Sequence, residues 1–277
     1  MGSEVGGRLV NMTVFKRPDI RFPPAKKKLW HELLPNSRFL VNMYAAGSSL
    51  LPDSVITTIA KGILTTRGAP DFGMFREGAI LVNNRGERFT DELKNPHQAL
   101  AEQPEYQGYI IFDSKFAKKF SSWPCFVSTA AGVAYAYVQD YERDTPDIIS
   151  KGQTLREAAA RIHPQPDTVV RTVERYNSFV EKQGDTDFGR SPLGDGIVTP
   201  PFYVMGPAMA YIGITWGGLD VDSNFQVLNE PGQVIPGLFS AGRNAGGLMM
   251  MGHGLGLAWA LTSGRLAGKI AARSVPA

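Results

Sequence analysis

The stretch IPGLFSAGRNAGG at residues 235–247 constrains the fold of this chain more than any other segment. A Pro-Gly turn leads into a short apolar run, which ends at Ser-Ala-Gly and is followed by more glycine. Glycine lets the backbone approach a flat or charged ligand closely, because it has no Cβ atom. Residues 255–274 have the pattern of a helix, whose first N–H groups carry partial positive charge. We therefore expect a short buried strand at 237–242, a glycine-rich loop and a helix over 255–274.

The chemistry of this segment leaves two interpretations open. GHGLGLA at 252–258 imitates the dinucleotide fingerprint G-x-G-x-x-G, but its glycines alternate and no strand–helix–strand unit follows. One interpretation is a phosphate or cofactor loop, and the other is the close-packed start of a helix. Close packing accounts for Gly246 and Gly247 but not for the further glycines around 249–251.

Composition excludes several classes of protein. The chain has 277 residues, of which 43% are hydrophobic and 20% charged, as expected for one large globular domain or two ordinary ones. A net charge of +3 does not favour a nucleic-acid partner. The single cysteine, Cys125, excludes an internal disulfide framework and suits a reducing compartment. Because the N-terminus also lacks a signal-peptide pattern, we expect a cytoplasmic location.

Membrane, metal and nucleophile motifs are not found. Residues 244–263 carry no charged side chain, but their glycines and His253 argue against a membrane-spanning helix. The four histidines lie far apart in the sequence, so we expect no metal site. The chain lacks the G-x-S-x-G and Walker A motifs.

Elsewhere, hydrophobic periodicity and turn residues predict a mixture of strands and helices. The expected strands are 37–45, 78–83 and 106–113, with β-hairpin material at 202–222 and 225–229. The expected helices are a short one capped by Asp113, and those at 154–162 and 167–183. A Gly/Pro/Asp-rich connector at 184–201 predicts a domain boundary.

Three separate motifs carry a resemblance to a known family. The run TWGGLDVDSNFQVLNEPGQVIPGLFSAGRNAGG at 215–247, with GRLAG at 264–268, resembles the C-terminal flavin-binding signature of the fumarate reductase/succinate dehydrogenase flavoproteins. That superfamily includes the 3-ketosteroid dehydrogenases. GAILVNNRGERFTDE at 78–92 resembles a motif of the family's capping domain, and PPFYVM at 200–205 resembles its return to the flavin domain.

The resemblance implies an α/β fold combined with α+β. It implies a partial FAD-binding domain, a Rossmann-like remnant at 1–25 and 200–277, interrupted by a capping domain at 26–199. The family's N-terminal G-x-G-x-x-G unit has no counterpart in this sequence, so we expect FAD to bind weakly or not at all to this chain. A non-catalytic fragment or interaction module without flavin is the alternative interpretation.

The resemblance also implies an FAD-dependent oxidoreductase that acts on a C–C bond next to a carbonyl of a small-molecule substrate. The family's proton-donating arginine aligns near Pro96, and nearly all of its other charged or polar anchors align with apolar residues. An apolar pocket desolvates a carboxylate without pairing it, at a cost of several kcal/mol. We therefore expect a fairly apolar, steroid-like substrate that contacts Phe72, Trp216 and Met251. The electron acceptor is left open.

The cofactor contacts implied by the resemblance are Ala241, Gly242, Arg243, Gly254, Leu255 and Leu257. Arg243 stands where the family usually carries a glutamate. Arginine donates hydrogen bonds but cannot accept them, so its contact must differ from the glutamate's. It is expected to face a phosphate or, alternatively, to pair with a surface carboxylate.

The proton-transfer group is expected to be Tyr211 or His253. Tyr211 precedes the T-x-G-G motif, and the family's ketosteroid dehydrogenases use tyrosine hydroxyls for this step. His253 titrates nearest neutral pH. Alternatively, Tyr211 only fills a strand face and His253 only hydrogen-bonds a loop carbonyl, in which case the proton moves elsewhere.

Overall fold

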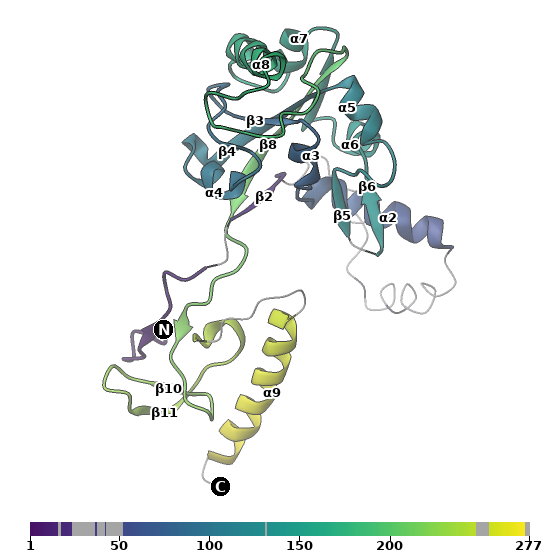
Figure 1. The fold of residues 1–277 in the computed structure, drawn as a ribbon. Helices are drawn as coiled ribbons and strands as arrows, with labels where there is room; N and C mark the ends of the chain where they lie inside the picture. Colours follow the sequence, from purple (N-terminus) through teal and green to yellow (C-terminus); the bar gives the residue numbers. More distant parts are fainter. Residues whose placement is uncertain are drawn as a thin grey trace. The chain divides into compact units, whose positions relative to one another are not determined.

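The computed structural model describes residues 1–15, 18–23, 37, 42, 52–130, 132–247 and 255–274. The chain divides into two compact units, Met1–Arg17 with Ile212–Ala277, and Pro18–Tyr211 (Figure 1). The mixture of helices and sheets expected from the sequence is confirmed. The division into a partial FAD-binding domain and a capping domain at 25/26 and 199/200 stays a prediction.

The larger unit, Pro18–Tyr211, is built on a five-stranded antiparallel sheet. Its strands are β2 (Asp19–Arg21), β3 (Ile80–Asn83), β4 (Gln107–Asp113), β7 (Ile149–Gly152) and β8 (Phe202–Tyr211). β8 is the shared strand: β4 pairs along one of its edges, while β7 and β2 divide the other edge between them. β3 then pairs with the free edge of β4.

Helices bury both faces of this sheet (Figure 1). One face carries Ile80 and Ile111 and packs against α7 (Leu155–Ala160) and α8 (Pro166–Glu181). The other face carries Leu81 and Ile110 and packs against three short helices. These are α3 (Gly73–Arg76), α5 (Ser114–Lys119) and α6 (Val138–Asp144). Neighbouring residues of β3 and β4 therefore enter different cores, as the period of two of a strand requires.

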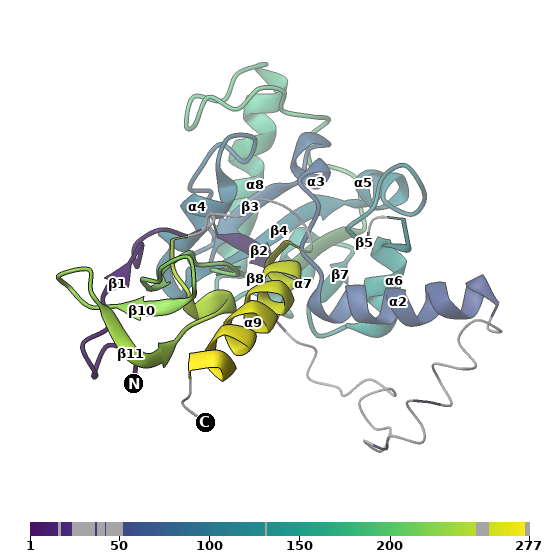
Figure 2. The ribbon, with the colours of Figure 1, turned by 90° about the horizontal axis from the view of Figure 1, so that it is seen from below.

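Smaller elements complete this unit. They are α2 (Asp53–Arg67), α4 (Pro96–Ala101), the 3-10 turn η2 (Pro104–Tyr106) and the hairpin of β5 (Ser128–Ala130) and β6 (Ala134–Ala136). α2 packs along this hairpin and α6 (Figure 2).

Side-chain caps form where the sequence predicts helix starts. Asp113 Oδ1 accepts a hydrogen bond from Phe116 N at 3.0 Å and begins α5. Thr154 and Glu157 form a capping box at the start of α7, in which each accepts a backbone N–H of the other. α8 buries Val169 and Val173 at helical spacing. All three helix predictions are confirmed.

The smaller unit has two short antiparallel strand pairs and one long helix. β1 (Leu9–Val10) pairs with β9 (Gly218–Leu219), and β10 (Gln226–Leu228) pairs with β11 (Val234–Phe239). The 3-10 turn η3 (Gly242–Asn244) follows. α9 (Leu255–Ser274) begins and ends where predicted and packs against β11 and η3 (Figure 2).

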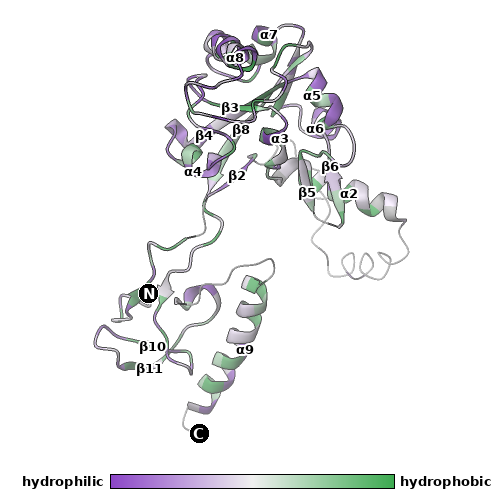
Figure 3. Ribbon diagram, viewed as in Figure 1, coloured by the Kyte–Doolittle hydropathy of each residue, from purple (hydrophilic) through white to green (hydrophobic). Residues whose placement is uncertain are grey.

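α9 is largely apolar, yet it buries mainly small side chains (Figure 3). Ser263 and Ala267 are its buried residues, and the Trp259 ring lies 5.8 Å from that of Phe225. Leu257 and Leu261 are each 68% exposed within this structure. Small residues on the packed side let the helix approach the backbone of η3 closely.

Two strand predictions need correction. The hairpin expected from residues 202–222 and 225–229 forms only at its end, where Val221 makes an antiparallel bridge with Val227 and Leu228 N donates to Asp220 O at 2.9 Å. Residues 202–211 instead form β8 of the larger sheet. The strand predicted as buried at 237–242 ends at Phe239 and is half-buried or exposed, since its sheet has only two strands. The strand predicted at 37–45 falls outside the described residues, apart from Ser37 and Asn42.

A buried ionic network joins the sheet of the larger unit to the loop before β8. Glu92 is fully buried and accepts hydrogen bonds from Arg88 Nε at 2.9 Å and Arg190 Nη1 at 3.0 Å. Arg88 Nη2 also donates to Asp185 at 3.0 Å. Arg190 donates to the carbonyl oxygens of Ala79 and Phe75. The four charges balance, so each is compensated without solvent.

We predict that Glu92→Gln destabilises the larger unit strongly. The substitution leaves two buried guanidinium groups with one carboxylate fewer, which costs about 3–5 kcal/mol. Thermal unfolding followed by circular dichroism should show a midpoint lower by about 10 °C. Lys115→Met is the control, because its ion pair with Asp195 has side chains 63% and 75% exposed, and it should leave the midpoint unchanged. Equal midpoints for Glu92→Gln and the wild type would contradict the role given to the network.

The same network predicts a dependence of stability on pH. Burial disfavours the charged form of Asp185, but its hydrogen bond and ion pair with Arg88 outweigh burial and hold the pKa of this carboxyl below its usual range. A depressed pKa in the folded state stabilises the fold above the unfolded pKa, and this contribution is lost as pH falls. Chemical denaturation between about pH 6 and pH 3 should therefore show a smaller decline of unfolding free energy for Asp185→Asn than for the wild type. Identical slopes would refute this assignment.

Candidate functional site

Two glycine-rich segments of the smaller unit, residues 215–219 and 240–247, lie side by side. Leu219 forms a parallel bridge with Ala245, and Gly246 N donates to Leu219 O at 2.8 Å. A Cβ atom on Gly218 would lie 2.5 Å from Asn244 O, and one on Gly246 would lie 2.7 Å from Val10 Cγ2. These two glycines are therefore required by the packing of the segments on each other, which supports the close-packing interpretation at these positions.

Side chains of α9 hold the backbone of Gly242 through both its N–H and its carbonyl oxygen. Its N–H donates to Ser263 Oγ at 2.9 Å, and its carbonyl oxygen accepts from Trp259 Nε1 at 3.1 Å. The Ser263 hydroxyl donates in turn to Trp259 O at 2.6 Å. Gly242 has φ +62°, a conformation that glycine adopts without strain. The sequence analysis missed Ser263 and Trp259, although a serine among the small apolar residues of this helix was a usable signal.

Arg243 lies over the first turn of α9. Its Nη1 donates to Thr215 O at 3.2 Å, and a Cβ atom on Gly256 would lie 2.7 Å from its Nη2. No carboxylate of the described residues forms an ion pair with Arg243, so the expected alternative of a surface pair finds no support in this part of the chain. A guanidinium beside the positive end of a helix favours an acceptor or an anion at the same place.

The other predicted cofactor residues are placed as follows. Ala241 precedes η3 in extended conformation, while Leu255 and Leu257 are 43% and 68% exposed on the first turn of α9. Gly254 lies outside the described residues, as do Met251 and His253. The structure thus places Arg243 beside Gly256 in the first turn of α9, which also carries Leu255 and Leu257, and holds Gly242 against Trp259 and Ser263 further along the helix.

The predicted substrate and proton-transfer residues fall in both units. Tyr211 is the last residue of β8, pairs with Asp19, and places its hydroxyl 3.5 Å from Met209 Sδ. Phe72 precedes α3 and packs edge-on against Phe75. Trp216 belongs to the smaller unit, where its backbone N–H donates to Val14 O at 3.0 Å.

Two buried polar atoms of the smaller unit have no hydrogen-bond partner among its described residues. They are Trp216 Nε1, directly before Gly217, and Ser240 Oγ, directly before Ala241. Both belong to the two glycine-rich segments. The sequence analysis did not single out Ser240, because a hydroxyl without a partner is recognised only once the surrounding contacts are known.

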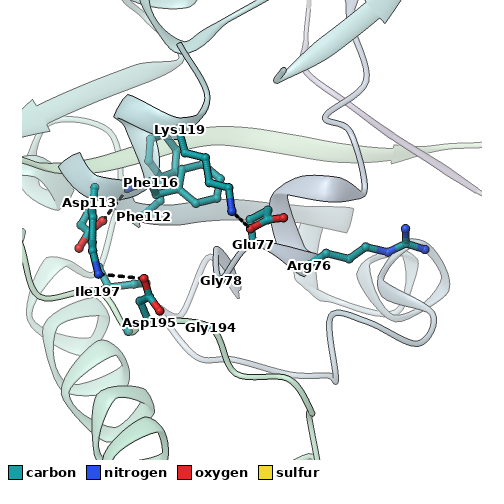
Figure 4. A pocket seen from close by; sticks show the side chains of 12 residues that line it. Arg76, Glu77, Gly78, Phe112, Asp113, Phe116, Lys119, Gly194, Asp195 and Ile197 are labelled. Carbon is teal, nitrogen blue, oxygen red and sulfur yellow. Dashed lines mark hydrogen bonds and ion pairs between the residues drawn. The ribbon is translucent and has the colours of Figure 1, made fainter. Parts of the chain in front are cut away.

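A cavity of about 280 Å³ opens in the larger unit (Figure 4). Its floor includes the rings of Phe112 and Phe116, and Lys119 bridges to Glu77 across it. The Arg76 side chain points away from the other lining groups in Figure 4. None of the residues predicted as functional lines this cavity.

The described residues offer neither a metal site nor a membrane-spanning helix. They contain no cluster of His, Cys, Asp and Glu side chains that could hold a metal ion. None of their helices is long and apolar enough to cross a membrane.

Comparison with known proteins gives a consistent family. The family described as an FAD binding domain matches residues 50–256. A fumarate reductase (cytochrome) from Shewanella frigidimarina is 32% identical over 71% of this chain and 32% of its own length. A 4-oxocyclohexanecarboxylate 2-dehydrogenase from Sinomonas cyclohexanicum is 28% identical over 69% of this chain and 36% of its own length. The open conformation of a flavocytochrome c3 fumarate reductase has a TM-score of 0.63 at 23% identity, over 99% of this chain and 39% of that chain.

The chain thus spans about a third of the length of the curated relatives it matches. The structural likeness shows a shared fold, and the family match covers more than half of the chain. The chain belongs to the FAD binding domain family and is a fumarate reductase-like flavoprotein sequence.

Proposed function

We propose that this chain is the part of an FAD-dependent oxidoreductase that contacts flavin and substrate, and that the enzyme acts on a C–C bond next to a carbonyl. The family match over residues 50–256 carries this proposal. FAD, when bound, takes up or delivers the hydride. The chain's own residues would position the flavin, exclude water and move a proton.

The junction of η3 and α9 fits an acceptor-rich ligand such as FAD. Gly256 leaves room for the Arg243 guanidinium over the first turn of α9, so that a cation and a helix N-terminus point at the same place. Gly242 N already donates to Ser263, so the charged donor that η3 offers a ligand is the side chain of Arg243. Ala241, Leu255, Leu257 and Gly254 would complete the cofactor contacts.

We expect the substrate to be a fairly apolar ketone, with steroid-like enones as one class. Pro96, aligned with the family's proton-donating arginine, is buried at the start of α4 and supplies no charge. Phe72 and Trp216 are apolar where a dicarboxylate would need cations. One relative is named for dehydrogenating 4-oxocyclohexanecarboxylate, a ring ketone, and another for reducing fumarate. The lack of cationic anchors favours a neutral ring ketone over a dicarboxylate.

Binding of FAD to the purified chain tests this proposal. Titration followed by flavin fluorescence should give weak but saturable quenching, and Arg243→Leu should weaken the affinity about tenfold further through loss of a charge-assisted hydrogen bond. Arg273→Leu is the matched control, because this arginine is exposed in the last turn of α9 and lies outside the proposed site. Absence of saturable binding in the wild type would instead favour the alternative of a non-catalytic fragment.

The proton-transfer group is tested by Tyr211→Phe and His253→Ala in the FAD-loaded chain. Loss of a general acid or base typically slows proton transfer by about 100-fold or more. Single-turnover reduction of the flavin by a cyclic ketone should therefore be slowed to this extent in one of the two variants. Wild-type rates in both variants would show that the proton moves through another group.

A further inference from the structure

In the smaller unit some polar side chains have hydrogen-bond partners, whereas two buried ones have none among the described residues. Trp259 Nε1 donates to Gly242 O, and Ser263 Oγ both accepts from Gly242 N and donates to Trp259 O. By contrast, Trp216 Nε1 and Ser240 Oγ are buried without a partner among the described residues. The same two residue types are thus fully paired on α9 and unpaired in the glycine-rich segments.

Unpaired buried donors are costly and uncommon in folded proteins. Those with no partner in a structure often await a ligand, an ion or a water molecule. Both atoms are shielded from bulk solvent, so a partner has to be a group that enters the fold. The cost of leaving these atoms unpaired is removed when such a group binds.

The two unpaired atoms belong to segments that the fold holds together. Trp216 follows Thr215, whose carbonyl oxygen accepts from Arg243, and Ser240 comes shortly before that arginine. The Leu219–Ala245 bridge joins the same two segments further along. Ser240 therefore lies on the stretch that carries the proposed contacts at 241–243, and Trp216 lies on the stretch that packs against it.

The chemistry of the two groups defines what they require. An indole N–H can only donate, and a serine hydroxyl can donate as well as accept. The partner must therefore offer at least one acceptor to Trp216 and a second acceptor or a hydroxyl to Ser240. FAD offers acceptors along its length, on the isoalloxazine carbonyls, the ribityl hydroxyls and the phosphates.

We infer that Trp216 Nε1 and Ser240 Oγ are hydrogen-bond donors to FAD, an inference that rests on the proposed flavin site. Trp216 then serves the cofactor through its indole N–H, in addition to the substrate contact expected from its ring. Ser240, which lies within the signature at 215–247, becomes a cofactor donor in addition to the contacts expected from the resemblance.

The test compares Trp216→Phe and Ser240→Ala with Trp259→Phe and Ser263→Ala in the full chain. Two quantities are measured for each variant: the dissociation constant for FAD and the thermal midpoint of the FAD-free chain. The first two variants should weaken FAD binding about tenfold each, equivalent to about 1.4 kcal/mol. They should leave the FAD-free midpoint unchanged or higher, because they remove an unpaired donor. The second two should lower the midpoint, because they break hydrogen bonds that exist.

Repeating the titrations with riboflavin locates the contact. A loss of affinity seen with riboflavin and FAD alike assigns the donors to the isoalloxazine or ribityl portion. A loss seen with FAD alone assigns them to the phosphates or adenosine. Either result supports the inference.

Two outcomes overturn the inference. If the wild type binds FAD and both Trp216→Phe and Ser240→Ala bind it equally well, the inference fails while the proposed function stands. The same holds if these variants destabilise the FAD-free chain as much as their paired controls do, because the atoms then have a partner without flavin. If the wild type shows no flavin binding, the proposed function and the inference fail together.

Discussion

The arrangement of the smaller unit depends on the hydrogen bonds by which α9 holds the backbone of Gly242. Ser263 and Trp259 fix this peptide through its N–H and its carbonyl oxygen, and both side chains come from one helix. The anchor sets the direction in which η3 leaves β11 and brings Arg243 over Gly256. Without it, two short strand pairs and a mostly exposed helix would have little to define their arrangement. The position of the proposed cofactor contacts is therefore a consequence of two side chains outside the family's recognised motif.

In the larger unit, helices pack on both faces of a sheet centred on β8. The buried network around Glu92 joins the start of β3 to the loop that leads back to β8. Breaking a buried ion pair costs far more than breaking an exposed one. The motif at 78–92, recognised by its resemblance to a capping domain, is thus accounted for by structural requirements. Its Arg88 and Glu92 are both held in this buried network.

Local signals predicted the helices well and the strand partners poorly. The caps at Asp113 and Thr154 and the apolar period of α8 depend on residues close in sequence, and these predictions are confirmed. The run at 202–211 is apolar on both faces, so its sequence does not reveal that β4, β7 and β2 are its neighbours. The family and its cofactor class followed from motifs. The unpaired donors Trp216 and Ser240 could not be predicted, because hydrogen-bond satisfaction depends on tertiary contacts.

The central claim is that flavin binds where the two glycine-rich segments meet the start of α9. Hydrogen–deuterium exchange of the backbone, with and without FAD, measures this directly because exchange reports on local opening. The account predicts slower exchange with FAD in peptides covering 215–219, 240–246 and 255–260, and unchanged exchange in the core strand β4. Protection confined to peptides around the cavity of Phe112 and Lys119, or no protection anywhere, would contradict it.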